Sequence, residues 1–70
     1  MKAKIVKASD FAYIAELRKL EAPVDSYSLS FKTTWAGAKD PEGEHTVMQV
    51  TVNAEGLKTL RDIIDHEVTL

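Results

Sequence analysis

The sequence predicts a small α+β domain in which an antiparallel β-sheet carries helices on one face. This class rests on three patterns. Residues 26–35 alternate between apolar and polar side chains, as expected for a strand with one buried face. Residues 47–52 alternate in the same way, and residues 54–68 repeat apolar side chains at helical spacing. With a first strand near the amino terminus, the predicted order is β-α-β-β-α within a single domain, residues 1–70.

The amino-terminal third is predicted as a strand followed by a segment of ambiguous type. Residues 2–7 alternate weakly and form the first strand. Ser9 or Asp10 offers a cap for a helix over residues 10–22, which is rich in helix formers and ends before Pro23. The apolar residues of this segment also alternate as they would in a strand. The alternative fold is therefore a β-meander with a single C-terminal helix.

The two central strands are predicted to form a hairpin around the turn sequence Asp-Pro-Glu-Gly at residues 40–43. Centring the turn on Pro41 and Glu42 places side chains of the same character opposite one another. The predicted pairs are Trp35 with Met48, Thr33 with Val50, Phe31 with Val52, Thr34 with Gln49, Lys32 with Thr51, and Lys39 with Glu44. A shift of one residue would mix the two faces of the sheet.

The carboxy-terminal helix is predicted to begin after Asn53, a favourable N-cap. Leu57, Leu60 and Ile64 recur on one helical face. We expect this helix to cover the apolar face of the sheet, because a sheet of this kind needs one covered face. That face consists of Leu29, Phe31, Trp35, Met48, Val50 and Val52.

Length and composition fit one globular domain with a thin margin of stability. Of the 70 residues, 44% are hydrophobic and 29% are charged, which argues against disorder. Because ordering costs about 1.5 kcal/mol per residue, self-association or a bound partner would add useful stability. The chain has no cysteine, which excludes disulfides, thiolate metal sites and cysteine nucleophiles.

The sequence indicates a cytoplasmic protein with no membrane association. Its amino terminus lacks the apolar block of a signal peptide, and no apolar run approaches the roughly 20 residues of a membrane span. The absence of cysteine suits a reducing compartment. The formal net charge of −2 is too small to indicate a class of partner.

Two groups of potential metal ligands are weak candidates. The turn offers Asp40, Glu42, Glu44 and His45. A calcium loop needs about six oxygen ligands, and this spacing matches no standard metal site. Asp62 and His66 lie one helical turn apart on one face, but two helical ligands without a third or fourth do not make a metal site. We therefore expect no metal or cofactor.

No catalytic motif is present. The serines alternate along a strand and are not in a nucleophile-elbow sequence. Gly37, Gly43 and Gly56 match neither the Walker loop nor the dinucleotide fingerprint. We expect a protein that is not an enzyme and has no catalytic residues.

The leading functional hypothesis is a non-catalytic protein-binding module. Such a module would be a small regulator, adaptor or inhibitor that acts on a larger protein, as phages and mobile elements encode. The candidate contacts at the hairpin tip are Trp35, Lys39, Glu44 and His45. Trp35 is either a core residue or a partner contact, since tryptophan serves both purposes. An exposed sheet edge also makes a homodimer an alternative.

The alternative hypothesis is weak binding of nucleic acid by the basic amino-terminal segment. Its candidate contacts are Lys2, Lys4, Lys7, Arg18 and Lys19, provided that the fold brings them together. The isoelectric point of about 5.6 and the lack of aromatic residues on the predicted polar face disfavour this function.

Overall fold

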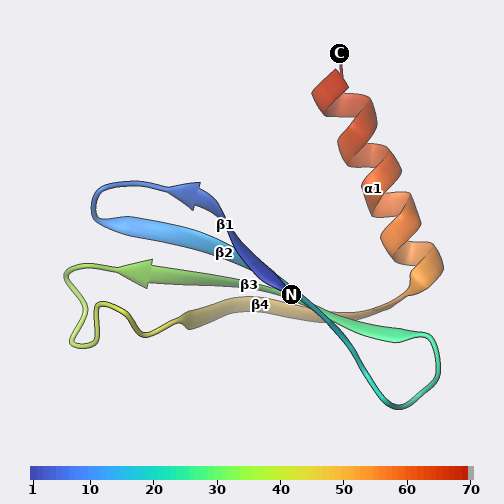
Figure 1. The fold of residues 1–70 in the computed structure, drawn as a ribbon, viewed down its shortest axis with the longest axis horizontal. Coiled ribbons are helices and arrows are strands. Elements are labelled where there is room, and N and C mark those ends of the chain that lie inside the picture. Colours follow the sequence, from blue (N-terminus) through green and yellow to red (C-terminus); the bar gives the residue numbers. More distant parts are fainter. Residues whose placement is uncertain (70) are drawn as a thin grey trace.

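The computed structural model describes residues 1–69, which form a four-stranded antiparallel sheet followed by one helix (Figure 1). The elements are β1 (Lys2–Lys7), β2 (Phe11–Lys19), β3 (Ser26–Trp35), β4 (His45–Asn53) and α1 (Ala54–Thr69). The strand order β1-β2-β3-β4 follows the chain, so the sheet is a meander. The α+β class and the alternative element order are confirmed, whereas the order β-α-β-β-α is wrong.

The error lies in residues 10–22, which were predicted as a helix. Residues 11–19 form β2, which pairs with β1 on one side and with β3 on the other. Ladder hydrogen bonds to two neighbouring strands outweigh the modest helix propensity of these residues. Ser9 and Asp10 lie in the hairpin turn and do not cap a helix; Ala8 donates its backbone N–H to the Phe11 carbonyl at 2.9 Å.

The strand register separates an apolar face from a polar face, because directly opposite residues share a face. The apolar face consists of the odd-numbered residues of β2 and β3, residues 48, 50 and 52 of β4, and Ala3 and Val6 of β1. The polar face consists of the even-numbered residues of β2 and β3, residues 49 and 51 of β4, and Lys2, Lys4 and Lys7 of β1. The alternation predicted for β3 and β4 is thus confirmed.

The predicted pairing register of the β3–β4 hairpin is wrong, although residues 48, 50 and 52 were assigned to the correct face of the sheet. Phe31 pairs with Met48 instead of Val52, an even shift that keeps both side chains on the apolar face. The cause is the loop, which contains two turns where one was predicted. The backbone N–H of Ala38 donates to the Trp35 carbonyl at 3.1 Å, and that of Gly43 donates to the Asp40 carbonyl at 3.0 Å. The turn at residues 40–43 therefore forms, but it does not lie at the centre of the hairpin.

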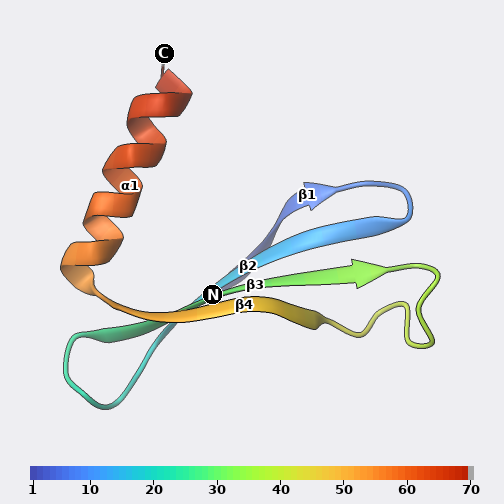
Figure 2. The same ribbon diagram turned by 180° about the vertical axis from the view of Figure 1, so that it is seen from behind.

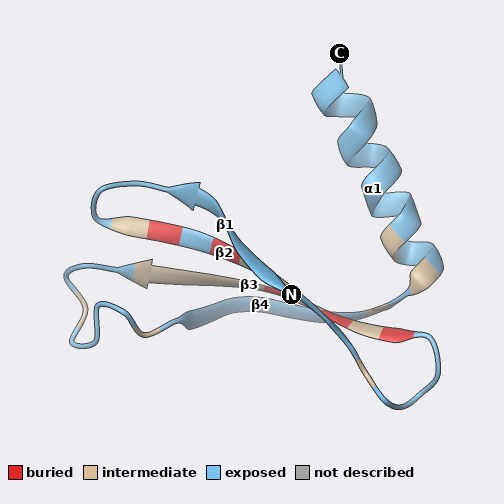
Figure 3. Cartoon of the chain, in the orientation of Figure 1, coloured by how far each residue is buried: buried red, intermediate tan, exposed pale blue. Residues whose placement is uncertain are grey.

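Residues 1–69 of the single chain form almost no apolar core (Figure 3). Ala12 and Ile14, 5% and 4% exposed, are the only buried hydrophobic residues among those described. They lie on the polar face, as do the buried Ser26, Ser28 and Ser30. Small side chains there are covered by longer neighbours; Gln49, for example, donates a hydrogen bond to Ser28 Oγ at 3.0 Å.

The helix α1 begins where the sequence predicts, at the residue after Asn53. The prediction that it covers the apolar face is wrong. The helix contacts β4 and projects away from the rest of the sheet, as both ribbon views show (Figures 1 and 2). The reason is the junction. Asn53 is both the last residue of β4 and the N-cap of α1, so no linker allows the helix to fold back.

The molecule is flat and extended for its length. Its principal extents are 38 × 36 × 16 Å, and its radius of gyration is 14.2 Å. A compact chain of this length has a radius of gyration of about 11 Å. Among residues 1–69, no helix combines the length and apolarity needed to cross a membrane.

Candidate functional site

No residue of the apolar face is buried in the described chain, so this face is an extended surface without a structural role of its own. Tyr13 and Met48 are each 47% exposed, and Val50 is 38% exposed. These three residues come from β2 and β4, so the exposed area extends across the sheet. Monomeric proteins rarely leave a continuous apolar area of this kind in water, and such areas commonly mark interaction sites.

Two interruptions of the strand pairing lie beside a hollow in the sheet. The pairing of β1 with β2 is interrupted between Lys4 and Val6, and that of β3 with β4 between Phe31 and Lys32. The hollow, of about 500 Å³, is lined by Ile5, Tyr13, Phe31, Lys32, Thr33 and Val47. Bulges often re-aim side chains beside functional sites. This hollow could accept an apolar side chain of a partner.

The helix presents a second uncovered apolar surface. Leu57, Leu60 and Ile64 lie along one stripe, as predicted, and Val68 extends it. Only Leu57 is partly covered, whereas Ile64 is 50% exposed. An amphipathic helix gains most of its stability by burying such a stripe against another element.

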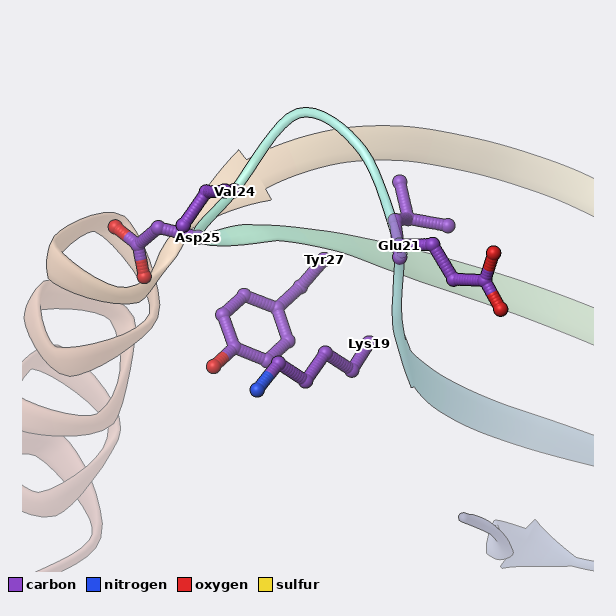
Figure 4. Close-up of a pocket in the computed structure, with 6 residues that line it drawn as sticks. Lys19, Glu21, Val24, Asp25 and Tyr27 are labelled. Carbon is purple, nitrogen blue, oxygen red and sulfur yellow. The ribbon is translucent and has the colours of Figure 1, made fainter.

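A shallow hollow lies where the β2–β3 loop approaches the start of α1 (Figure 4). It is lined by Lys19, Leu20, Glu21, Val24, Asp25 and Tyr27. The loop is closed by a hydrogen bond from the Leu20 backbone N–H to the Ser26 carbonyl at 2.9 Å. Its charged groups are of both signs, and none is paired with an orienting neighbour in the way that a catalytic site requires.

The polar face contains a chain of ion pairs. Lys32 Nζ lies 2.8 Å from Glu16 Oε1 and 3.6 Å from Glu44 Oε1, and Lys2 Nζ lies 2.7 Å from Glu44 Oε2. The hydrogen bond from Lys32 lowers the pKa of Glu16, and that from Lys2 lowers the pKa of Glu44. The bond to Glu16 raises the pKa of Lys32 in turn. These pairs link β1, β2 and β3 to the β3–β4 loop.

The four residues predicted as partner contacts at the hairpin tip do not form one cluster. Trp35 is 58% exposed, which settles that it lies outside a core. Its ring lies against Gly37, where an added Cβ would come within 2.5 Å of Trp35 Cζ2. Glu44 is engaged by Lys2 and Lys32 on the polar side, whereas His45 pairs with Thr33 on the apolar side. The predicted pair of Lys39 with Glu44 is absent from the ion pairs of residues 1–69.

Four of the five basic residues predicted to contact nucleic acid share the polar face. Lys2, Lys4 and Lys7 pair with even-numbered residues of β2, which lie on the polar face. Arg18 lies opposite Ser28 on the same face. The fifth, Lys19, pairs with Tyr27 on the apolar face. The sequence alone did not place them together, because residues 10–22 were predicted as a helix. The alternation of Phe11, Tyr13, Ala15 and Leu17 was the signal that could have found this arrangement.

The remaining potential ligands stay apart. Within the described part of the chain, no group of three or more His, Asp or Glu side chains is placed to hold a metal ion. Asp62 pairs with Arg61 at 3.3 Å on the exposed surface of α1.

The candidate site is therefore a pair of surfaces, an apolar face with its neighbouring helix stripe and a basic polar face. Their chemistry allows binding of apolar and of anionic groups respectively. Known proteins offer no further guide: no protein-family model, no curated protein and no solved structure compared with this chain matches it.

Proposed function

We propose that this protein is a non-catalytic protein-binding module that contacts its partner through the apolar face of the sheet. One observation carries the proposal: the hydrophobic side chains that would form the core of a single chain are exposed. Tyr13, Met48 and Val50 lie open on one continuous surface. Apolar area on this scale is stabilised when a second protein surface removes it from water.

The shape of this surface supports a protein partner over a small molecule. Small-molecule sites are concave and enclose most of their ligand. The apolar face is instead spread over four strands, and its hollow between Ile5 and Val47 is open. Trp35 at the edge of this face is a candidate anchor, since exposed tryptophan is enriched among residues that dominate binding energy.

Site-specific photo-crosslinking tests the proposal in the native host. A benzoylphenylalanine at position 50 lies on the apolar face, and the same group at position 51 lies on the polar face as the matched control. We expect a discrete crosslinked protein band from position 50 and not from position 51. The absence of a band at position 50, or equal bands at both positions, would contradict the proposal.

A second candidate function, weak binding of nucleic acid, is favoured by the polar face. Lys2, Lys4, Lys7, Arg18 and Lys32 share this face. Among the described residues, only Glu16 and Glu44 oppose them there in ion pairs. Lys4, Lys7 and Arg18 make no ion pair within residues 1–69, so their charges remain available for phosphates.

A salt titration tests this second function. The fluorescence anisotropy of a labelled oligonucleotide would show binding at low salt that weakens steeply as salt rises. The double variant Lys4→Gln with Lys7→Gln should reduce the salt slope, because two phosphate contacts are removed. The double variant Lys58→Gln with Arg61→Gln on α1 is the control of equal charge. No binding at low salt would eliminate this function.

A further inference from the structure

We infer that the partner of the apolar face is a second copy of this chain, and that α1 of each copy lies across the apolar face of the other. This inference rests on the proposed function and identifies the protein partner, which the proposed function does not specify. Three observations lead to it: the excess surface of the single chain, the junction between β4 and α1, and the presence of two matching surfaces on one chain.

The single chain exposes more surface than a folded protein of its mass. Its accessible surface is 5703 Å². A folded monomer of 7.8 kDa exposes about 4,400 Å². The excess, about 1,300 Å² per chain, is larger than the roughly 800 Å² that each partner buries in a standard stable interface. The uncovered area is therefore sufficient for a stable dimer.

The junction between strand and helix leaves α1 away from most of its own sheet. Asn53 ends β4 and accepts the Gly56 N–H through Oδ1 at 2.8 Å, so the helix starts without a linker. The helix then projects from the end of β4 with its apolar stripe uncovered (Figure 3). Leu60 and Ile64 need a surface that the same chain does not bring to them.

A second copy supplies both missing partners at once. Each chain has one uncovered apolar sheet face and one uncovered apolar helix stripe. A two-fold axis that places each helix on the other sheet satisfies both surfaces in a closed pair, with no further chain required. The dimensions agree: α1 has 16 residues and is about 24 Å long, close to the roughly 30 Å length of β3 and β4.

The mass of the purified protein is the first test. Analytical ultracentrifugation should give twice the chain mass of 7.8 kDa at micromolar concentration. Ile64→Lys, on the apolar stripe, should raise the dissociation constant of the dimer by about 30-fold or more. His66→Lys introduces the same group on the opposite side of α1 and should leave the dissociation constant unchanged. A folded wild-type monomer at these concentrations would overturn the inference.

Crosslinking provides a test that does not depend on how a variant folds. A benzoylphenylalanine at position 64 is introduced, and the purified protein is prepared as a mixture of ¹⁴N-labelled and ¹⁵N-labelled chains. Mass spectrometry should find mixed-isotope crosslinks from position 64 to residues of β2, β3 or β4 on the apolar face. Crosslinks within one chain, or between two helices only, would overturn the proposed arrangement.

The two proposals can fail separately. If the purified protein is a folded monomer but position 50 captures a different protein in the host, the dimer is wrong and the binding module stands. If the photo-crosslinker at position 50 captures no protein in the host and the purified protein is a monomer, the binding module and the dimer are both wrong. If the protein is a dimer whose crosslinks from position 64 reach the apolar face, both are supported.

Discussion

Asn53 Oδ1 accepts a hydrogen bond from the backbone N–H of Gly56 at 2.8 Å, directly where β4 ends and α1 begins. One side chain thus satisfies an amide at the helix start and, because no linker intervenes, sets the direction in which the helix leaves the sheet. Gly56 suits this position, since an added Cβ would lie 3.2 Å from Asn53 Oδ1.

Replacing the cap should destabilise the protein measurably. We expect Asn53→Ala to lower the free energy of unfolding by about 1 kcal/mol, because the Gly56 amide loses its acceptor. Urea denaturation followed by circular dichroism, at a fixed chain concentration, measures this change. Asn53→Asp retains an oxygen acceptor and should keep most of the stability. An equal loss of unfolding free energy in both variants would show that the hydrogen bond to Gly56 does not contribute to stability.

Loss of the ion pairs on the polar face should lower the stability of the protein at both low and high pH. Glu16 and Glu44 have a lowered pKa, so their contribution is complete above the ordinary value of 4.5 and is lost as the pH falls through their folded pKa. Lys32 has a raised pKa, so its contribution is complete below 10.5 and is lost as the pH rises through its folded pKa. The melting temperature should therefore decline below about pH 4.5 and above about pH 10.5.

Removing the charge of Lys32 tests whether this residue causes the lowered pKa of Glu16. In Lys32→Gln, NMR titration should find the pKa of Glu16 closer to its ordinary value of 4.5, because the principal hydrogen-bond donor to that carboxylate is gone. Lys39→Gln, in the exposed β3–β4 loop, is the control and should leave the Glu16 pKa unchanged. A lowered Glu16 pKa that persists in Lys32→Gln would contradict this account.

The contact of Trp35 with Gly37 can be followed by fluorescence, because Trp35 is the only tryptophan of the chain. A Cβ at Gly37 would lie 2.5 Å from the ring, so Gly37→Ala should displace the indole from the loop. We expect more efficient acrylamide quenching, with a change in unfolding free energy within about 0.5 kcal/mol because the ring can rotate. Lys39→Ala should leave the quenching unchanged. Identical quenching in Gly37→Ala would refute the contact.

Asp25 adopts a left-handed backbone conformation, with φ of 64°. Asp and Asn tolerate this region, whereas a β-branched residue is strained there. Asp25→Val should therefore lower the free energy of unfolding by about 1–2 kcal/mol, and Asp25→Asn should be close to neutral. Thermal denaturation of both variants measures the difference. Equal stability of the two would argue against this conformation.

Much of the candidate site could not be predicted from the sequence, and particular residues show why. The binary pattern assigned Leu29, Phe31 and Val50 to one apolar face, which the register confirms. It did not reveal that this face is uncovered. The shared position of Lys4 and Arg18 was also missed, since it depends on β2 pairing with both of its neighbours.

The sequence by itself determined the features that depend on neighbours along the chain. These are the alternation of β3 and β4, the turn at residues 40–43 and the Asn53 cap of α1. Each follows from side-chain spacing or from a local hydrogen bond. Only the tertiary structure decided the state of residues 11–19, the register of the β3–β4 hairpin and the position of α1. The state of residues 11–19 depends on pairing with distant segments, whose free energy exceeds the local helix propensity. The register depends on the two turns of the β3–β4 loop and the position of α1 on a junction without a linker, neither of which the side-chain spacing specifies.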